Sequence, residues 1–214
     1  MTANITSSSL EIELKRSFFS KRKMLLIDAL GITYNNKTIL FNEVKRIRYG
    51  SQQIYINGIK SRRDYMFHIE ATERMNIEFG SSSLMSSSVE KMDKQYSDII
   101  NVLWKNYTSG FVNDWIKKLN HGDAIKVGNF EVNQKGIKVF YTRFLFVKKE
   151  ELIPWKECLK GTGPGYLYVQ SSKDKKMEGR SMFLATWNLN AFHSLLNYLW
   201  ENGNCFKLEK GEKI

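Results

Sequence analysis

The apolar residues of the chain follow two spacings, and each spacing dominates different stretches. Residues 10–14 alternate between apolar and charged side chains, which is the period of a half-buried strand. Similar short runs continue to residue 79 and are separated by Gly, Asn and Ser, as in antiparallel sheets and barrels. Residues 1–9 are expected to form a frayed tail. The predicted strands lie at 10–14, 24–27, from 32, 38–41, 44–49, 54–56, 65–69 and 75–79.

Two later stretches have helical spacing and share one pattern. In both Ser97–Asn106 and His193–Asn202 the apolar residues lie on one stripe of an α-helix. Each stripe carries a tryptophan, so each helix has a Trp-bearing face that preceding residues must cover. Because this pattern occurs once in each half, the sequence indicates a duplicated unit. The matching residues are Asn101, Leu103, Trp104 and Asn106 in the first copy and Asn197, Leu199, Trp200 and Asn202 in the second.

A turn pattern also recurs in both halves. Leu25–Ile32 and Phe130–Ile137 both read apolar, any residue, β-branched, Asp or Asn, two residues, then Gly-Ile. Gly31 and Gly136 are therefore predicted to have a structural role, supplying the positive φ of a tight turn. Further on, Pro154–Cys158 matches Leu40–Val44.

These landmarks divide the chain into two domains. The first is expected at 1–108 and the second at 122–214. Between them, residues 111–119 show a helical apolar stripe that has no counterpart after Trp200. Residues 109–121 are therefore interpreted as a linker helix, with a break or kink at Gly110.

The repeated unit resembles the pleckstrin-homology-like (PH-like) fold, with its closest likeness to bacterial PH-like domains. This resemblance implies a mostly β protein with α-helix: two tandem PH-like units, each a bent antiparallel sheet or barrel capped by one C-terminal helix. It also implies that Trp104 and Trp200 plug the cores beneath the two helices. In eukaryotic members of the family, basic residues on the first two strands and their loop bind phosphoinositide headgroups. The residues of this chain in that region are Lys15, Lys21, Arg22 and Lys23.

Composition and charge restrict the class of protein. With 42% apolar residues, each half can bury a core, and the formal charge of +11 favours anionic partners. The alternative is that the charge merely covers solvated faces. We expect a cytoplasmic protein, peripheral at the membrane, because there is no long apolar run, no signal-peptide pattern and only two cysteines.

No catalytic constellation is found. The three histidines lie far apart in the sequence and have no metal-ligand spacing, and Cys158 is interpreted as a small core residue. Glu43 and Glu157 recur at matching positions, but neither has a second carboxylate nearby for acid–base chemistry. We therefore expect no enzyme activity, metal or cofactor.

The predicted function is that of a non-enzymatic binding or adaptor protein at anionic surfaces. Phe18 and Phe19, followed by Lys21, Arg22 and Lys23, are the candidates for membrane contact, because apolar side chains beside cations are typical of interfacial anchors. The alternative is that both phenylalanines pack beneath the sheet.

Three other partners remain open. An acidic protein would suit the same cations. Nucleic acid would need exposed aromatic side chains as stacking platforms, for which Tyr49, Tyr55, Tyr166 and Tyr168 are candidates. A homo-oligomeric scaffold, formed by pairing of sheet edges, would need no ligand.

Overall fold

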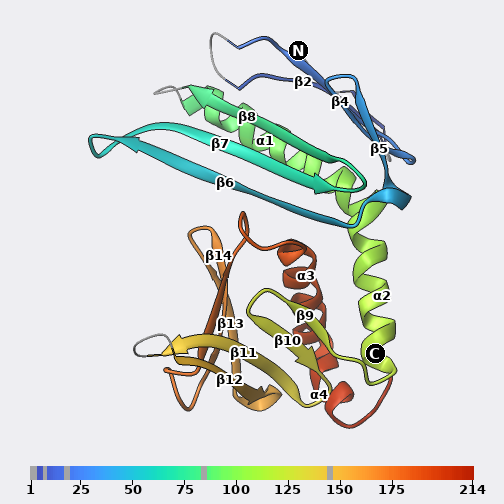
Figure 1. Cartoon of the computed structure of the whole chain (residues 1–214), viewed down its shortest axis with the longest axis vertical. Helices are drawn as coiled ribbons and strands as arrows, with labels where there is room; N and C mark the ends of the chain where they lie inside the picture. The colour runs from blue at the N-terminus through green and yellow to red at the C-terminus, as the bar shows by residue number, and fades with distance from the viewer. Residues whose placement is uncertain (1–3, 7–8, 17–19, 83–85, 144–146) are drawn as a thin grey trace. The chain divides into compact units, whose positions relative to one another are not determined.

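The computed structural model describes residues 4–6, 9–16, 20–82, 86–143 and 147–214. The chain forms two compact units, residues 1–109 and 110–214, and both are built mainly from antiparallel strands (Figure 1). This architecture agrees with the expected β-rich class that contains α-helices.

The first unit contains a five-stranded sheet, a three-stranded sheet and a helix. Helix α1 (Ser86–Leu103) follows the last strand and packs against β2, β3 and β8. The five-stranded sheet has the order β1 (Asn4–Thr6), β2 (Ser9–Leu14), β3 (Lys23–Ile27), β4 (Gly31–Tyr34), β5 (Lys37–Leu40). The three-stranded sheet has the order β6 (Arg46–Ile56), β7 (Ile59–Glu70), β8 (Arg74–Ser82).

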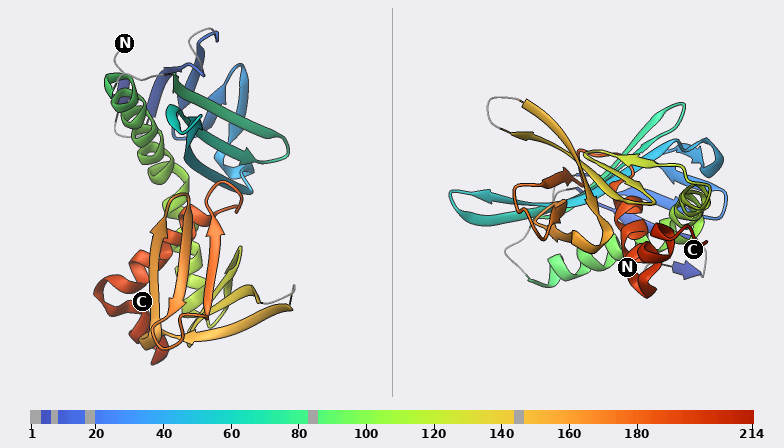
Figure 2. Two further views of the ribbon diagram at one scale, coloured as in Figure 1. Left: turned by 90° about the vertical axis from the view of Figure 1, so that its left-hand side faces the viewer. Right: turned by 90° about the horizontal axis from the view of Figure 1, so that it is seen from below.

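The second unit repeats this plan with a four-stranded and a three-stranded sheet. Helix α3 (Leu189–Trp200) follows the last strand, and the short α4 (Asn204–Glu209) comes after it. The four-stranded sheet contains β9 (Ile125–Val127), β10 (Phe130–Asn133), β11 (Gly136–Arg143) and β12 (Val147–Pro154). The three strands of the other sheet lie side by side in Figure 2 and are β13 (Cys158–Gly163), β14 (Tyr166–Ser171) and β15 (Glu178–Met182).

Two strand predictions in the first unit were wrong. The expected tail contains β1, which pairs with β2. The two short strands expected at 44–49 and 54–56 form the single strand β6, because the polar segment between them pairs with β7 throughout. Backbone hydrogen bonding here overrides the polar side chains, which lie on exposed sheet positions.

A helix forms where the linker helix was predicted, but the expected break at Gly110 was wrong. Helix α1, the π-helical turn η2 (Trp104–Thr108) and α2 (Ser109–Asn120) follow one another directly, and Gly110 lies inside α2. Val112, Trp115 and Leu119 of α2 are buried in the core of the second unit. This apolar face stabilises the helix, and a glycine in a helix costs only about 1 kcal/mol.

The recurring turn has the same construction in both units. Asp28 Oδ1 accepts hydrogen bonds from the backbone N–H groups of Leu30 and Gly31, at 2.8 and 3.0 Å. Asn133 Oδ1 likewise accepts one from Lys135, at 2.8 Å. A Cβ atom at either Gly31 or Gly136 would come within 3.0 Å of a carbonyl oxygen on the neighbouring strand.

The reason for glycine differs from the prediction at one of these two positions. Gly136 has the expected positive φ, +155°, whereas Gly31 is not among the glycines with positive φ. At Gly31 the close approach of the paired strand β5 excludes a side chain instead.

The two predicted plugs differ in burial. Trp104 is 38% exposed, so its prediction as a core residue was wrong. The buried stripe of α1 runs through Ile99, Val102 and Leu103, and the next residue is turned by about 100° away from that stripe. Tyr107, rather than Trp104, packs against the core of the first unit, and its ring stacks on Phe41 at 5.9 Å between ring centroids.

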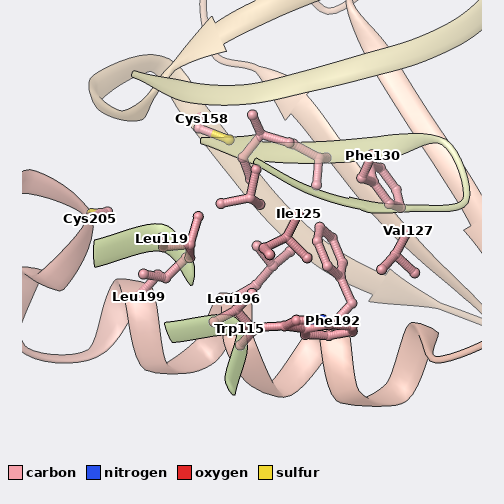
Figure 3. Packing of buried hydrophobic residues seen from close by; sticks show 14 of the residues in the cluster. Trp115, Leu119, Ile125, Val127, Phe130, Cys158, Phe192, Leu196, Leu199 and Cys205 are labelled. Atoms are coloured by element: carbon pink, nitrogen blue, oxygen red, sulfur yellow. The ribbon is translucent and has the colours of Figure 1, made fainter. Parts of the chain in front are cut away.

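Trp200 does pack against its core. Its ring meets Trp155 edge to face at 5.4 Å, and Trp155 occupies the position in the second unit that matches Phe41. Deeper in the same core lie Phe130, Phe192 and Trp115 (Figure 3). Cys158 is also buried there, as expected for a small apolar residue.

The two cysteine thiols should be unreactive in the folded protein. Cys158 and Cys205 are both buried, and burial raises the pKa of Cys158 to about 12. Because the thiolate is the reactive form, we expect negligible reaction with a thiol reagent at pH 8 and reaction of both thiols after denaturation. Rapid reaction without denaturant would contradict this packing.

Candidate functional site

The basic residues predicted from the sequence lie around the connection between β2 and β3. Lys21, Arg22 and Lys23 are exposed and Lys15 is half-buried. Arg22 forms a 3.0 Å ion pair with Glu13, and Lys23 Nζ lies 5.6 Å from the ring centroid of Tyr34. Part of this positive charge is therefore satisfied within the unit. Phe18 and Phe19 lie outside the described residues, so their predicted membrane contact stays a prediction.

A second basic region lies in the second unit and was not found from the sequence. It is an open cavity of about 620 Å³ on the four-stranded sheet. Lys126 on β9 and the adjacent Lys148 and Lys149 on β12 line it, together with one carboxylate, Glu150. The lysine pair at the start of an exposed strand was the available sequence signal. The lining is completed by Gly128, Asn129, Phe140, Tyr141 and Thr142.

The wall of this cavity is held in place by the turn between β9 and β10. Asn129 donates its backbone N–H to Ser181 Oγ at 3.0 Å and its side-chain amide to the carbonyl of Arg180 at 2.7 Å. Its carbonyl accepts the N–H of Phe140 at 2.9 Å. Gly128 has a φ of +57°, and a Cβ there would press against Thr186 and Ser181. The turn is thus fixed to β11 and β15.

The electrostatics of the cavity favour an anion. Lys126 Nζ lies 4.2 Å from the ring centroid of Phe140, which positions the ammonium group over the cavity wall. Glu150 faces Lys138, whose Nζ lies 3.9 Å from it and 3.6 Å from Glu131. Glu150 and Glu131 thus share Lys138, and the three lining lysines of β9 and β12 outnumber the lining carboxylate of Glu150.

The aromatic residues considered for nucleic acid differ in burial and belong to both units. Tyr49 is buried and stacks on Phe67 at 5.4 Å in the core of the first unit. Tyr55 is exposed on β6. Tyr166 and Tyr168 are neighbours on β14 of the second unit, 6.4 Å apart, with their rings against glycines of β13. Tyr49 is therefore a core residue, Tyr55 lies in the first unit, and Tyr166 and Tyr168 form a pair in the second.

The repeated glutamates make local structural contacts. Glu43 accepts the backbone N–H of Leu40 at 3.2 Å, at the end of β5. Glu157 forms a 2.8 Å ion pair with Lys173. Within the described ranges, no group of three or more His, Cys, Asp or Glu side chains is arranged to hold a metal ion.

The chain matches no protein-family model, no curated protein and no solved structure. Among the described helices, none combines the length and apolar character needed to cross a membrane.

Proposed function

We propose that this chain is a non-enzymatic binding or adaptor protein of two tandem PH-like units that associates with anionic membrane surfaces. Two features support the PH-like assignment. In each unit a sheet of four or five strands precedes a three-stranded sheet, and a helix follows the last strand. This order agrees with the architecture implied by the sequence resemblance.

The observation that carries the proposed function is the basic cavity of the second unit. Its volume of about 620 Å³ lies in the range of small-ligand sites, and it is open enough to admit a headgroup phosphate. Each lysine near an anionic leaflet contributes about 1 kcal/mol, so Lys126, Lys148 and Lys149 together would strengthen binding on the order of 100-fold. Salt should weaken the interaction.

Reversing the charge of the cavity is the test. Lys148→Glu with Lys149→Glu should lower cosedimentation with phosphatidylserine-containing vesicles by more than tenfold, because two attractive charges become repulsive. The melting temperature should stay nearly unchanged, since both side chains are exposed.

The matched control is Lys175→Glu with Lys176→Glu. These lysines are equally exposed and lie in the same unit, but they are not part of the cavity lining. The control carries the same change in net charge, so equal loss of binding in both variants would show that only overall charge matters. Binding that survives the Lys148 and Lys149 reversal would refute the cavity as the site.

Parallel measurements separate the other partners. Oligonucleotide binding over the same salt series, without vesicle binding, would favour the nucleic-acid alternative. A mass that rises with concentration, with no binding to either, would favour the homo-oligomeric scaffold. Binding of an acidic protein through the same lysines would support the cavity as the binding site, with a protein rather than a membrane as its partner.

A further inference from the structure

The hairpin formed by β6 and β7 extends beyond the third strand of its sheet. Among the described residues, the pairing of β7 with β8 reaches Arg62 and Ser82, whereas β6 and β7 stay paired to Ile56 and Ile59. In Figure 1 this hairpin projects past the end of β8. The two-residue turn at its end, Asn57-Gly58, has φ values of 51° and 77°, as in the tight type I′ turns of hairpins.

The end of this hairpin exposes large apolar side chains. Tyr55 is 56% exposed, Ile56 59% and Ile59 64%. Ile56 and Ile59 are paired directly across the two strands, and Tyr55 is paired with Lys60. These four residues, together with Asn57-Gly58, are called the hairpin tip below. Single exposed apolar residues are common, but a cluster at a projecting tip marks an interaction site.

The hairpin is held in a defined shape. A β-bulge lies between Ile54 and Tyr55, and Gln53 Nε2 spans the bulge by donating to the carbonyl of Arg62 at 2.9 Å. Nearer the base, both carboxylate oxygens of Asp93 on α1 accept from Arg63, at 3.0 and 3.1 Å. These side-chain hydrogen bonds therefore stabilise the hairpin that carries the apolar tip.

The charge of the hairpin indicates what the tip meets. Arg62 and Arg63, next to the tip, form 3.0 Å ion pairs with Asp64 and Asp93. The cation within the tip itself is Lys60, which is exposed. The tip is also narrow and convex, since it consists of two strands and a two-residue turn. A convex apolar end with a cation beside it suits a deformable lipid surface, in which the apolar groups enter and the ammonium group stays at the phosphates.

We propose that the hairpin tip inserts Tyr55, Ile56 and Ile59 into an anionic membrane and thereby forms a second membrane contact, on the first unit. This inference rests on the proposed membrane association and adds an apolar contact to the electrostatic one. Apolar insertion is resistant to salt, whereas the cavity lysines act through screened charge. The two contacts can therefore be distinguished by experiment.

The test uses the full-length chain and phosphatidylcholine vesicles with and without phosphatidylserine. Ile56→Ser with Ile59→Ser should lower binding to the anionic vesicles at least tenfold and abolish the part that persists at high salt. The control, Leu30→Ser with Met182→Ser, removes apolar side chains that are 73% and 60% exposed elsewhere and should bind as the parent does. Unchanged melting temperatures would show that both variants fold.

A second readout reports insertion directly. A polarity-sensitive dye on Ile59→Cys should shift its emission to the blue on anionic vesicles, because the two natural thiols are buried and the label stays at the tip. Binding that is unaffected by Ile56→Ser with Ile59→Ser, or a dye that stays in water, would overturn the inference. In that case the proposed function is still tested by Lys148→Glu with Lys149→Glu.

Two other outcomes concern the parent protein and self-association. If the parent protein binds no vesicle, both the proposed function and this inference are overturned. If the serine variant loses self-association but binds vesicles as the parent does, the tip is a contact with a second copy of the chain.

Discussion

Replacing Gly136 by alanine is expected to lower the free energy of unfolding by about 3 kcal/mol or more. The new Cβ would meet the carbonyl oxygen and carbon of Ile153 on the paired strand, both closer than real Cβ atoms come to such groups. These are backbone atoms, so relief requires β11 and β12 to separate where their pairing begins. The positive φ of Gly136 adds strain. Urea denaturation followed by circular dichroism measures the effect.

Gly110→Ala is the matched control. No atom lies within 4 Å of a Cβ at that position, and the residue lies inside a helix. Because alanine favours the helix and reduces the entropy of the unfolded chain, this variant should gain about 0.4–1 kcal/mol. Equal stability of the two alanine variants would contradict the close strand pairing at Gly136.

Phe192→Ala should cost about 3–5 kcal/mol of unfolding free energy, as large-to-small changes in a core do. Phe192 is fully buried, stacks on Phe130 at 5.7 Å and meets Trp115 edge to face at 6.4 Å. Alanine would remove the central ring of this group, visible in Figure 3, and leave a cavity. Urea denaturation again gives the change.

Trp104→Ala is the informative comparison for Phe192→Ala. Although its indole is larger than a phenyl ring, its 38% exposure predicts a smaller cost, about 1–2 kcal/mol. A loss for Trp104→Ala as large as that for Phe192→Ala would mean that Trp104 is a core plug after all.

Many of the strands and helices could be predicted from the spacing of apolar residues alone. The alternation in Leu10–Leu14 and the stripe through Ile99 and Leu103 reflect burial on one face, and burial is what those patterns encode. The exposure of Trp104 was missed because the buried stripe of α1 ends at Leu103, and Tyr107 rather than Trp104 stacks on Phe41. The burial of α2 likewise depends on contacts far apart in sequence.

The candidate sites were harder to predict than the fold. Lys126 and the pair Lys148-Lys149 are separated in the sequence and lie on β9 and β12, the two edge strands of the four-stranded sheet, so only the folded sheet brings them to one cavity. In contrast, Lys21 to Lys23 form a visible run, but ion pairing with Glu13 already uses Arg22. A search for runs of basic residues in the sequence therefore finds Lys21 to Lys23 and misses the lysines of the cavity.

The carboxylate of Asp93 has a mechanical consequence for the first unit. It accepts hydrogen bonds from Arg63 and, at 2.7 Å, from the hydroxyl of Tyr65. Strand β7, which carries part of the hairpin tip, is therefore bound to the first half of α1. The strand is connected to α1 by these side-chain contacts in addition to its backbone pairing with β8. Asp93 therefore links the projecting hairpin to α1, and its loss would leave the hairpin without these two side-chain contacts to the helix.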